Sequence, residues 1–317
     1  MKGFLKSLAF FVVPVLLLAI GAEVFLRLIP NDYRNKRLYL EANSPKIKAL
    51  FLGNSHALYD INPEYITINS FNSSHVSQSL DIDLEILKKY AGHWDSLKYI
   101  VLPADYFTYY LRLDKGEEAY RIKNYKLYHK LQVGDNVTDN FELLSTPFKL
   151  NANRLFSYCF TGNKPTICTP LGWATDYEAR YSQNIQATGE YAAGKHYIKD
   201  KSLYPELVKA TNEIIDFAQQ QNIRVMLITY PASKAYIQHL DSAQLNKTIS
   251  TAKELASKFD NVTYLNMLTD TAFTDADFYD GDHMNDIGAK KFSLKLNYLL
   301  NVDYAVEQWD WDSMDTQ

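Results

Sequence analysis

The sequence predicts an α/β fold in which a parallel sheet is covered by helices on both faces. Short apolar runs alternate with amphipathic segments of helical spacing, which is typical of strands joined by crossover helices. Two polar strings bound this region: Gly-Asn-Ser-His at 53–56 follows the first apolar run, and Asp-Gly-Asp-His at 280–283 precedes the last helical segment. With 317 residues, 47% of them hydrophobic, the chain is long enough for one large domain with an insertion.

Three strands are predicted before the insertion, at 47–52, 65–71 and 97–102. A helix between the second and third ends near Gly92. Its apolar face is formed by Leu80, Leu84, Leu87 and Tyr90. Because parallel strands need crossover connections, this helix is expected to cover one face of the sheet.

The alternation resumes after residue 200. Helices are predicted over 207–218 and 245–255, each before a strand, at 223–230 and 262–267, and a last helix begins at Asn285 or Asp286. Together the elements predict a flavodoxin-like three-layer sheet. Between about 105 and 200 the chain is rich in Tyr and Asn, and we interpret this part as an insertion that forms a lid or wall at the C-terminal edge of the sheet.

The N-terminus is apolar from Leu8 to Leu28 apart from Glu23 and Arg27. As a helix it is long enough to cross a bilayer, so residues 1–30 are expected to form a membrane anchor or a signal segment. A cleaved signal peptide with Ala19-x-Gly21 as its processing site is the rival interpretation. We favour the anchor because the apolar stretch is long. Residues 31–45 are then a juxtamembrane linker or short helix with solvated charges, and 46–317 the main domain.

The charges around this segment do not favour export, because more basic residues follow it than precede it. Large C-terminal domains translocate regardless of such charges, however. The only two cysteines, Cys159 and Cys168, suit a disulfide in an oxidising compartment, with two unpaired buried thiols as the alternative. We therefore expect a single-pass membrane protein whose main domain lies outside the cytoplasm, in the periplasm or at the cell surface.

Ser55, Asp280 and His283 are the candidate catalytic residues. Gly53 permits a sharp turn that lifts Ser55 out at the end of the first strand, where nucleophiles of α/β enzymes lie. A serine hydroxyl needs an imidazole to take its proton, and the imidazole needs an acid to fix its tautomer. Asp280, three residues before His283, is better placed than Asp282, which is expected to point elsewhere. The alternative is a helix-capping aspartate and a surface histidine.

These motifs resemble those of the SGNH (GDSL-type) hydrolase family. Gly53-x-Ser55 after the first strand and Asp280-x-x-His283 before the last helix match its first and last blocks. The first block usually reads Gly-Asp-Ser-Leu, and here Asn54 and His56 replace its second and fourth residues. This form is similar to that of membrane-anchored members associated with surface polysaccharide. The resemblance implies an exported serine esterase or O-acyltransferase that acts on acyl groups, chiefly acetyl, of a cell-surface carbohydrate and needs no cofactor.

The family's oxyanion hole also uses a glycine and an asparagine from two further blocks, and this sequence departs from both. A backbone N–H near Ser77 and the side-chain amide of Gln78 or Asn72 are the substitutes, while Leu-Pro-Ala-Asp at 102–105 stands where Gly-x-Asn is expected. Loss of one such donor costs about 3 kcal/mol of barrier. The departure motivates a second hypothesis, a catalytically weak glycan-binding component of envelope assembly.

Several other side chains are expected near the pocket. The candidate substrate-binding residues are Asn54, His56, Asp105, Lys234 and Tyr236. For His56, and for His75, a structural hydrogen-bonded role is an equal alternative, and Lys234 is otherwise simply solvated. A further set of aromatic residues either stacks on sugar rings or forms the insertion's own core: Tyr106, Tyr109, Tyr110, Trp173 and Tyr177.

Composition and charge spacing disfavour two other classes. The formal net charge of -4 and the scattered basic residues argue against a nucleic-acid partner. The aspartates at 275, 277, 280 and 282 lack the spacing of a calcium loop, so no metal site is predicted. The expected partners are an acylated carbohydrate and the membrane.

Overall fold

The computed structural model describes residues 2–199 and 202–302, and the C-terminal end of the predicted domain, 303–317, lies outside the described residues. Its centre is one parallel sheet of five strands in the order β2-β1-β3-β4-β5. The strands are β1 (Ala49–Phe51), β2 (Ser70–Asn72), β3 (Tyr99–Pro103), β4 (Arg224–Thr229) and β5 (Val262–Asn266). This is the flavodoxin-like order, so the predicted fold class is confirmed.

Strand boundaries match the sequence predictions closely except at β2. The strand was expected from residue 65, but Pro63–Tyr65 forms a 3₁₀ turn, and pairing with β1 covers only three residues. The prediction of an earlier start is therefore wrong. An apolar run marks burial, whereas a strand exists only where a neighbouring strand supplies hydrogen bonds.

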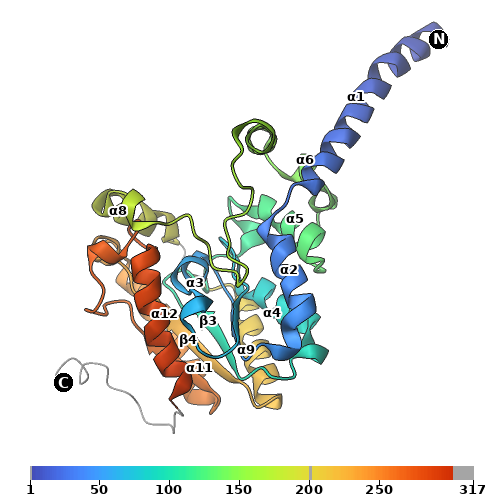
Figure 1. Cartoon of the computed structure of the whole chain (residues 1–317). Coiled ribbons are helices and arrows are strands. Elements are labelled where there is room, and N and C mark those ends of the chain that lie inside the picture. Colours follow the sequence, from blue (N-terminus) through green and yellow to red (C-terminus); the bar gives the residue numbers. More distant parts are fainter. Residues whose placement is uncertain (1, 200–201, 303–317) are drawn as a thin grey trace.

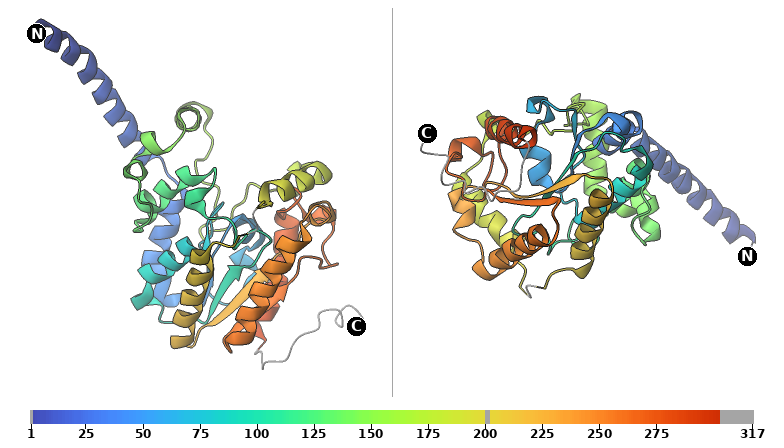
Figure 2. Two further views of the ribbon diagram at one scale, coloured as in Figure 1. Left: turned by 180° about the vertical axis from the view of Figure 1, so that it is seen from behind. Right: turned by 90° about the horizontal axis from the view of Figure 1, so that it is seen from below.

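Successive strand residues point to opposite faces and build two cores. On one face Leu50, Ile100 and Leu227 pack under α2 (Asp32–Asn43), α4 (Leu80–Lys89), α9 (Pro205–Gln220) and α11 (Ser242–Lys258). On the other face Phe51 and Val101 pack under α3 (Ser55–Asp60) and α12 (Asp286–Asn301). The view from below shows the sheet between these two helical layers (Figure 2).

The chain changes direction across the sheet at β1. It passes from β1 to β2 on one side and then returns to β3 on the other. In open parallel sheets such a reversal leaves a crevice at the C-terminal ends of the strands. Ser55 follows β1 and Asp105 follows β3, so both flank this position.

Helix α1 (Lys2–Leu28) projects away from the rest of the molecule (Figure 1). An 18-residue window in it has a mean hydropathy of 2.5 and no residue buried by the described chain. It is long and apolar enough to span a membrane, a property that signal sequences share.

The expected linker contains helix α2, which packs on the main domain. Lys36 is 2% exposed, and its Nζ donates to the Ser74 carbonyl at 2.6 Å, so the expectation of solvated charges is wrong for this residue. The Tyr39 ring stacks on Phe71 of β2 with 4.2 Å between centroids. The sequence pattern missed this because Lys36 is buried by elements distant in the chain.

The insertion contains four short or medium helices: α5 (Ile122–Asn124), α6 (Glu142–Ser145), α7 (Phe148–Phe156) and α8 (Ile185–His196). Tyr106, Tyr109 and Tyr110 are buried, which supports the core alternative and rules out sugar stacking by these three. The expected disulfide between Cys159 and Cys168 is wrong, because both thiols are free, and the alternative of two buried thiols fails for Cys159, which is exposed, while Cys168 is half-buried. Closeness in the sequence does not by itself bring two cysteines into disulfide geometry. Helix α10 (Lys234–Ile237) follows β4.

Candidate active site

A tight turn after β1 places Ser55. Gly53 has φ +113°, and a Cβ there would lie 2.4 Å from Cδ of Pro103, so both the backbone conformation and the space require glycine. Asn54 then caps α3, its Oδ1 accepting from the N–H of His56 at 3.0 Å. Asn54 is buried and its amide donates to Asp105, which makes it a structural residue rather than a substrate-binding one.

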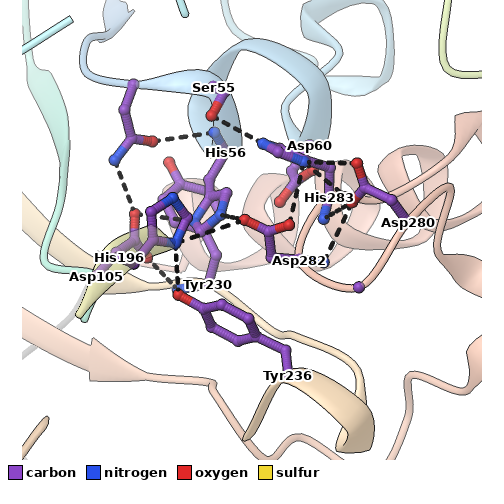
Figure 3. Close-up of polar contacts among 12 residues, drawn as sticks. Ser55, His56, Asp60, Asp105, His196, Tyr230, Tyr236, Asp280, Asp282 and His283 are labelled. Carbon is purple, nitrogen blue, oxygen red and sulfur yellow. Dashed lines mark hydrogen bonds and ion pairs between the residues drawn. The ribbon is translucent and has the colours of Figure 1, made fainter. Parts of the chain in front are cut away.

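Ser55, His283 and Asp280 lie in one hydrogen-bonded line (Figure 3). Nε2 of His283 is 2.8 Å from Ser55 Oγ, and Nδ1 is 3.0 Å from Asp280 Oδ1. Asp280 Oδ1 also accepts from the backbone N–H of His283 at 2.9 Å, which fixes the turn before α12. The structure thus brings together the three predicted residues from opposite ends of the domain.

Asp282 does not point away from the site as expected. Its Oδ1 lies 3.5 Å from His283 Nδ1, and its Oδ2 lies 3.4 Å from His56 Nε2 (Figure 3). Asp280 remains the closer carboxylate to His283. Asp282 therefore joins the candidate triad to a buried layer of charge beneath it.

His56 forms the centre of that layer. It is 3% exposed, with Nδ1 3.0 Å from Asp105 Oδ2 and Asp282 on its other side. Burial alone would lower the pKa of His56, but the two carboxylates outweigh burial and hold the pKa well above 6.5. Asp105 also accepts from the Tyr230 N–H at 3.1 Å. Direct substrate binding by His56 and Asp105 is therefore wrong, because both are enclosed by protein.

His196, which the sequence reasoning missed, completes the buried layer from α8. Its Nδ1 is 2.9 Å from the Tyr236 hydroxyl and 3.8 Å from Asp282 Oδ2. Burial lowers the pKa of His196 to about 4, so this imidazole is neutral at pH 7. Tyr236 is buried, so its predicted contact with substrate is also wrong. No motif marks His196, because its position depends on how α8 docks.

The charges around His283 shift its own pKa. Burial lowers the pKa of His283, but the negative charges of Asp282 and then Asp280 outweigh burial and raise the pKa to about 9. The same pairing holds the pKa of Asp282 below its usual range. At neutral pH both ring nitrogens of His283 carry protons, and Nε2 donates to Ser55 Oγ. The imidazole becomes a base only when that proton leaves.

The expected amide donors for an oxyanion are occupied. Asn72 Nδ2 donates to the carbonyls of Ala57 and Ile61, and Gln78 Nε2 donates to Ser73 O and Asp83. Both predictions are therefore wrong, because each amide has spent its two hydrogens inside the core.

The backbone N–H groups of Ser77 and Ser55 are the remaining candidate donors to an oxyanion. Ser77 has φ +60°, and its hydroxyl contacts Glu118 rather than Ser55. Ser55 is the first residue of α3, so its own N–H has no acceptor within the helix. That N–H belongs to the candidate nucleophile itself and is a candidate donor to an oxyanion.

The other sequence candidates fall into different surroundings. Lys234 is exposed, in line with the solvated alternative. His75 is buried, stacked on Tyr33 and 3.3 Å from His129 Nε2, which is a structural role. Of the aspartates at 275–282, Asp275 is exposed and Asp277 pairs with Lys291 at 2.7 Å, whereas Asp280 and Asp282 both lie beside His283.

Aromatic rings border the triad on the side of the insertion. Tyr177 stacks between Tyr59 and Tyr279, with centroid distances of 3.7 and 4.0 Å, and lies edge-on to His283. Both faces of Tyr177 are thus used. Trp173 donates from Nε1 to the Tyr59 carbonyl at 2.6 Å. The insertion therefore forms a wall beside Ser55, built largely from ring–ring contacts.

A cavity of about 260 Å³ lies away from these residues. It lies between the start of α2, the loop after β2 and the insertion, and its lining includes Tyr33, His75 and Arg154. None of the three triad residues lines it. It is therefore separate from the candidate site.

Fold and site together define an α/β protein with a serine, a histidine and an aspartate aligned at the C-terminal edge of a parallel sheet. The chain belongs to the family described as protein of unknown function DUF1574, whose model matches residues 54–287. No curated protein matches the sequence significantly.

Two solved structures are similar at the level of the backbone. One, described as "a putative platelet activating factor from Streptococcus pneumonia", has 12% identity and a TM-score of 0.38 and covers 92% of this chain and 99% of its own. The other, "a putative acylhydrolase" from Bacteroides fragilis NCTC 9343, has 12% identity and a TM-score of 0.39 and covers 84% and 94%. Similarity this low says nothing about chemistry, so the function is argued from the residues of this chain.

Proposed function

We propose that the protein is a membrane-tethered serine esterase or O-acyltransferase of the SGNH type. The observation that carries the proposal is the 2.8 Å distance between Ser55 Oγ and His283 Nε2, with Asp280 on the opposite ring nitrogen. A serine aligned in this way can be deprotonated as it attacks. The position after the first strand of a parallel sheet suits a nucleophile that must reach an external substrate.

In the first half-reaction Ser55 attacks the carbonyl carbon of an ester. Neutral His283 takes the hydroxyl proton at Nε2, while Asp280 holds Nδ1–H and stabilises the imidazolium that forms. When the tetrahedral intermediate collapses, the bond to the leaving alcohol breaks, and His283 returns the proton to that alcohol. The product is an acyl-Ser55 ester, with the Ser55 N–H as a donor to the oxyanion.

In the second half-reaction an acceptor hydroxyl attacks the acyl-Ser55 carbonyl, and His283 again accepts and returns the proton. Water as acceptor gives hydrolysis, and a sugar hydroxyl gives acyl transfer. That the substrate is a carbohydrate and the acyl group an acetyl is proposed from the resemblance of the Gly53-x-Ser55 and Asp280-x-x-His283 motifs to those of polysaccharide-associated SGNH hydrolases. The apolar helix α1 supports tethering, and the exported location is part of the proposal.

A second candidate function has its own support. The amides of Asn72 and Gln78 are occupied, and Asp105 stands where the family has an oxyanion asparagine. His283 is also protonated at neutral pH. These features suit a catalytically weak domain that binds a glycan during envelope assembly.

The discriminating experiment is covalent labelling of the full chain in lipid nanodiscs at pH 9. We expect a fluorophosphonate probe to add one group, which peptide mass spectrometry locates on Ser55, and Ser55→Ala to lose it. Ser257→Ala, at the exposed end of α11, serves as the matched control and keeps the adduct. A folded chain that gains no adduct, or an adduct that persists in Ser55→Ala, refutes the enzyme and favours the binding function.

A further inference from the structure

We propose that segment 141–160 of the insertion is a second membrane contact, which lies in the lipid interface beside α1. The segment comprises α6, α7 and the π-helical turn Ser157–Thr161 up to Phe160, and we call it the interfacial segment. The inference goes beyond the proposed chemistry and rests only on its membrane-tethering part. Four observations carry it: exposure, attachment to α1, charge and continuity.

The interfacial segment gathers exposed apolar side chains. Outside α1, fifteen large hydrophobic side chains are exposed among the described residues, and seven of them belong to this segment. Phe148 and Phe160 are 85% and 76% exposed. The seven are Phe141, Leu144, Phe148, Leu150, Phe156, Tyr158 and Phe160. Exposed apolar side chains concentrated in one short segment of chain favour contact with a partner or a membrane.

The segment is attached to the last turns of α1. The carboxylate of Glu23 accepts the N–H groups of Glu142 and Leu143, at 3.0 and 2.9 Å, and so caps the start of α6. Arg27 pairs with Glu23 at 2.6 Å and donates to the Asn140 carbonyl. These contacts account for the only two charged residues in the apolar stretch of α1. They also hold the segment beside Glu23, which lies more than one turn before the C-terminal end of α1.

Side chains of the segment contact the last turn of α1 directly. Phe25 lies edge-on to Tyr158, with ring centroids 6.1 Å apart, and Arg154 donates to the Leu26 carbonyl. Phe25 and Leu28, beyond Glu23, are themselves exposed. Figures 1 and 2 show α6 at the base of α1 and the α7 region on the same side of the molecule. Lipid that covers α1 down to Leu28 therefore reaches the segment.

Charge in this part of the chain matches a membrane surface. No Asp or Glu occurs between Glu142 and Asp176, whereas Lys149 and Lys164 are exposed there, and Arg154 pairs with Glu142 at 3.0 Å. Glu142 itself is buried and paired with Lys123 at 2.7 Å. Aromatic residues interspersed with basic ones are characteristic of segments that lie among lipid headgroups, where the cations meet anionic lipid.

The contact also relates the membrane to the site. Beyond the segment the chain runs on to Trp173 and Tyr177, which pack on Tyr59 beside the triad. A segment seated in the interface therefore sets the orientation of the site wall relative to the bilayer. α1 alone, as a single helix, leaves rotation about its own axis free.

The test uses the full chain in phosphatidylcholine vesicles containing anionic phosphatidylglycerol. An environment-sensitive fluorophore is attached to Cys159, which is exposed within the segment, in a Cys168→Ser background. The control carries Cys159→Ser and Cys168→Ser with Ser257→Cys, at the far end of α11. We expect a blue shift and strong quenching by headgroup-proximal nitroxide lipids at position 159, and neither at position 257.

Three results overturn the inference. In vesicle-bound chain, a Cys159 label as unshifted and unquenched as the control shows that the segment lies in water. A label whose shift depends on protein-to-lipid ratio and not on nitroxide lipid shows that a second copy covers the segment. Chain that fails to float with vesicles defeats the tethering itself, whereas loss of the Ser55 adduct defeats only the chemistry.

A surface variant provides a further check. Replacing Phe148, Phe156 and Phe160 with serine removes exposed rings only, so the fold is retained. We expect most of the quenching at Cys159 to be lost while the Ser55 adduct is unchanged. Undiminished quenching in this variant contradicts the inference.

Discussion

At the scale of single residues, the carboxylates that orient His283 also change its pKa. Asp280 orients its ring, and Asp282 lies 3.5 Å away and adds a second negative charge. Each carboxylate stabilises the imidazolium, and together they raise the pKa to about 9 despite burial. A base must release its proton before it can accept one from serine, so the groups that position His283 also reduce the fraction of it that can act as a base at neutral pH.

We predict that the rate of Ser55 acylation rises with pH through a single ionisation near 9. The protonated form dominates below that value, because the folded-state pKa lies above the ordinary value of 6.5. Stability has the opposite trend: the stabilisation from protonated His283 is fully present below about pH 6.5 and is lost as pH rises through about 9. The measurement is the pH profile of the labelling rate.

The variant Asp282→Asn tests whether the charge of Asp282 raises the pKa of His283. Removing that charge lowers the pKa of His283, and we expect the rising limb to move down by about one unit. Asp270→Asn, where the carboxylate pairs with Lys295 on α12 away from the triad, is the control and leaves the limb in place. A limb near 6.5 in the unaltered protein contradicts the prediction.

At the scale of elements, α8 supports the turn that carries His283. A Cβ on Gly281 would lie 2.1 Å from the Cα of Gly189, and a Cβ on Gly189 would lie 2.7 Å from the N of Tyr236. The turn, α8 and α10 thus meet at backbone contact distance. Because the obstructing atoms are backbone, a side chain at this point must separate the elements.

Gly189→Ala is therefore expected to destabilise the fold by about 1–3 kcal/mol, as overpacking does, and to slow Ser55 acylation by shifting the His283 turn. Gly194→Ala on the same helix is the matched control, because nothing lies within 4 Å of its Cβ position. Urea denaturation and the labelling rate measure the two effects. Equal behaviour of the two variants disproves the role of α8.

Elements differ in how far the sequence determines them. Helices α4, α9, α11 and α12 are predicted within a few residues, because each carries an apolar stripe against one sheet. Helix α8 carries no such stripe: its buried positions are Gly189, Ala192 and Ala193. Small residues give no hydrophobic period, so neither α8 nor the His196 that it supplies is visible in the sequence.

At the scale of the whole molecule, α1 joins the main domain without a flexible linker. Leu26 and Ile29 are buried, and α2 begins at Asp32. Arg37 donates to the Tyr128 carbonyl at 2.6 Å, and Lys36 is enclosed. The site therefore stands at a fixed height above the end of α1.

We predict that trypsin does not cut after Arg34, Lys36 or Arg37 in the folded chain, because cleavage requires local unfolding of α2. Lys258, at the exposed end of α11, is the internal reference and is expected to be cut first. Mass spectrometry of timed digests gives the order. Early cleavage within α2 would show that the anchor and the domain are flexibly joined.

The sequence by itself determined the sheet, its helical layers and the three candidate residues of the triad. The spacing of apolar residues and the turns that require glycine are signals within a few consecutive residues. The motifs Gly53-x-Ser55 and Asp280-x-x-His283 likewise each lie within one turn. Only the tertiary structure decided which polar groups are enclosed. His56, Asp105 and Tyr236 became a buried layer, and the amides of Asn72 and Gln78 were taken up by the core. Burial and hydrogen-bond partners depend on residues far apart in the chain, so no local pattern reveals them.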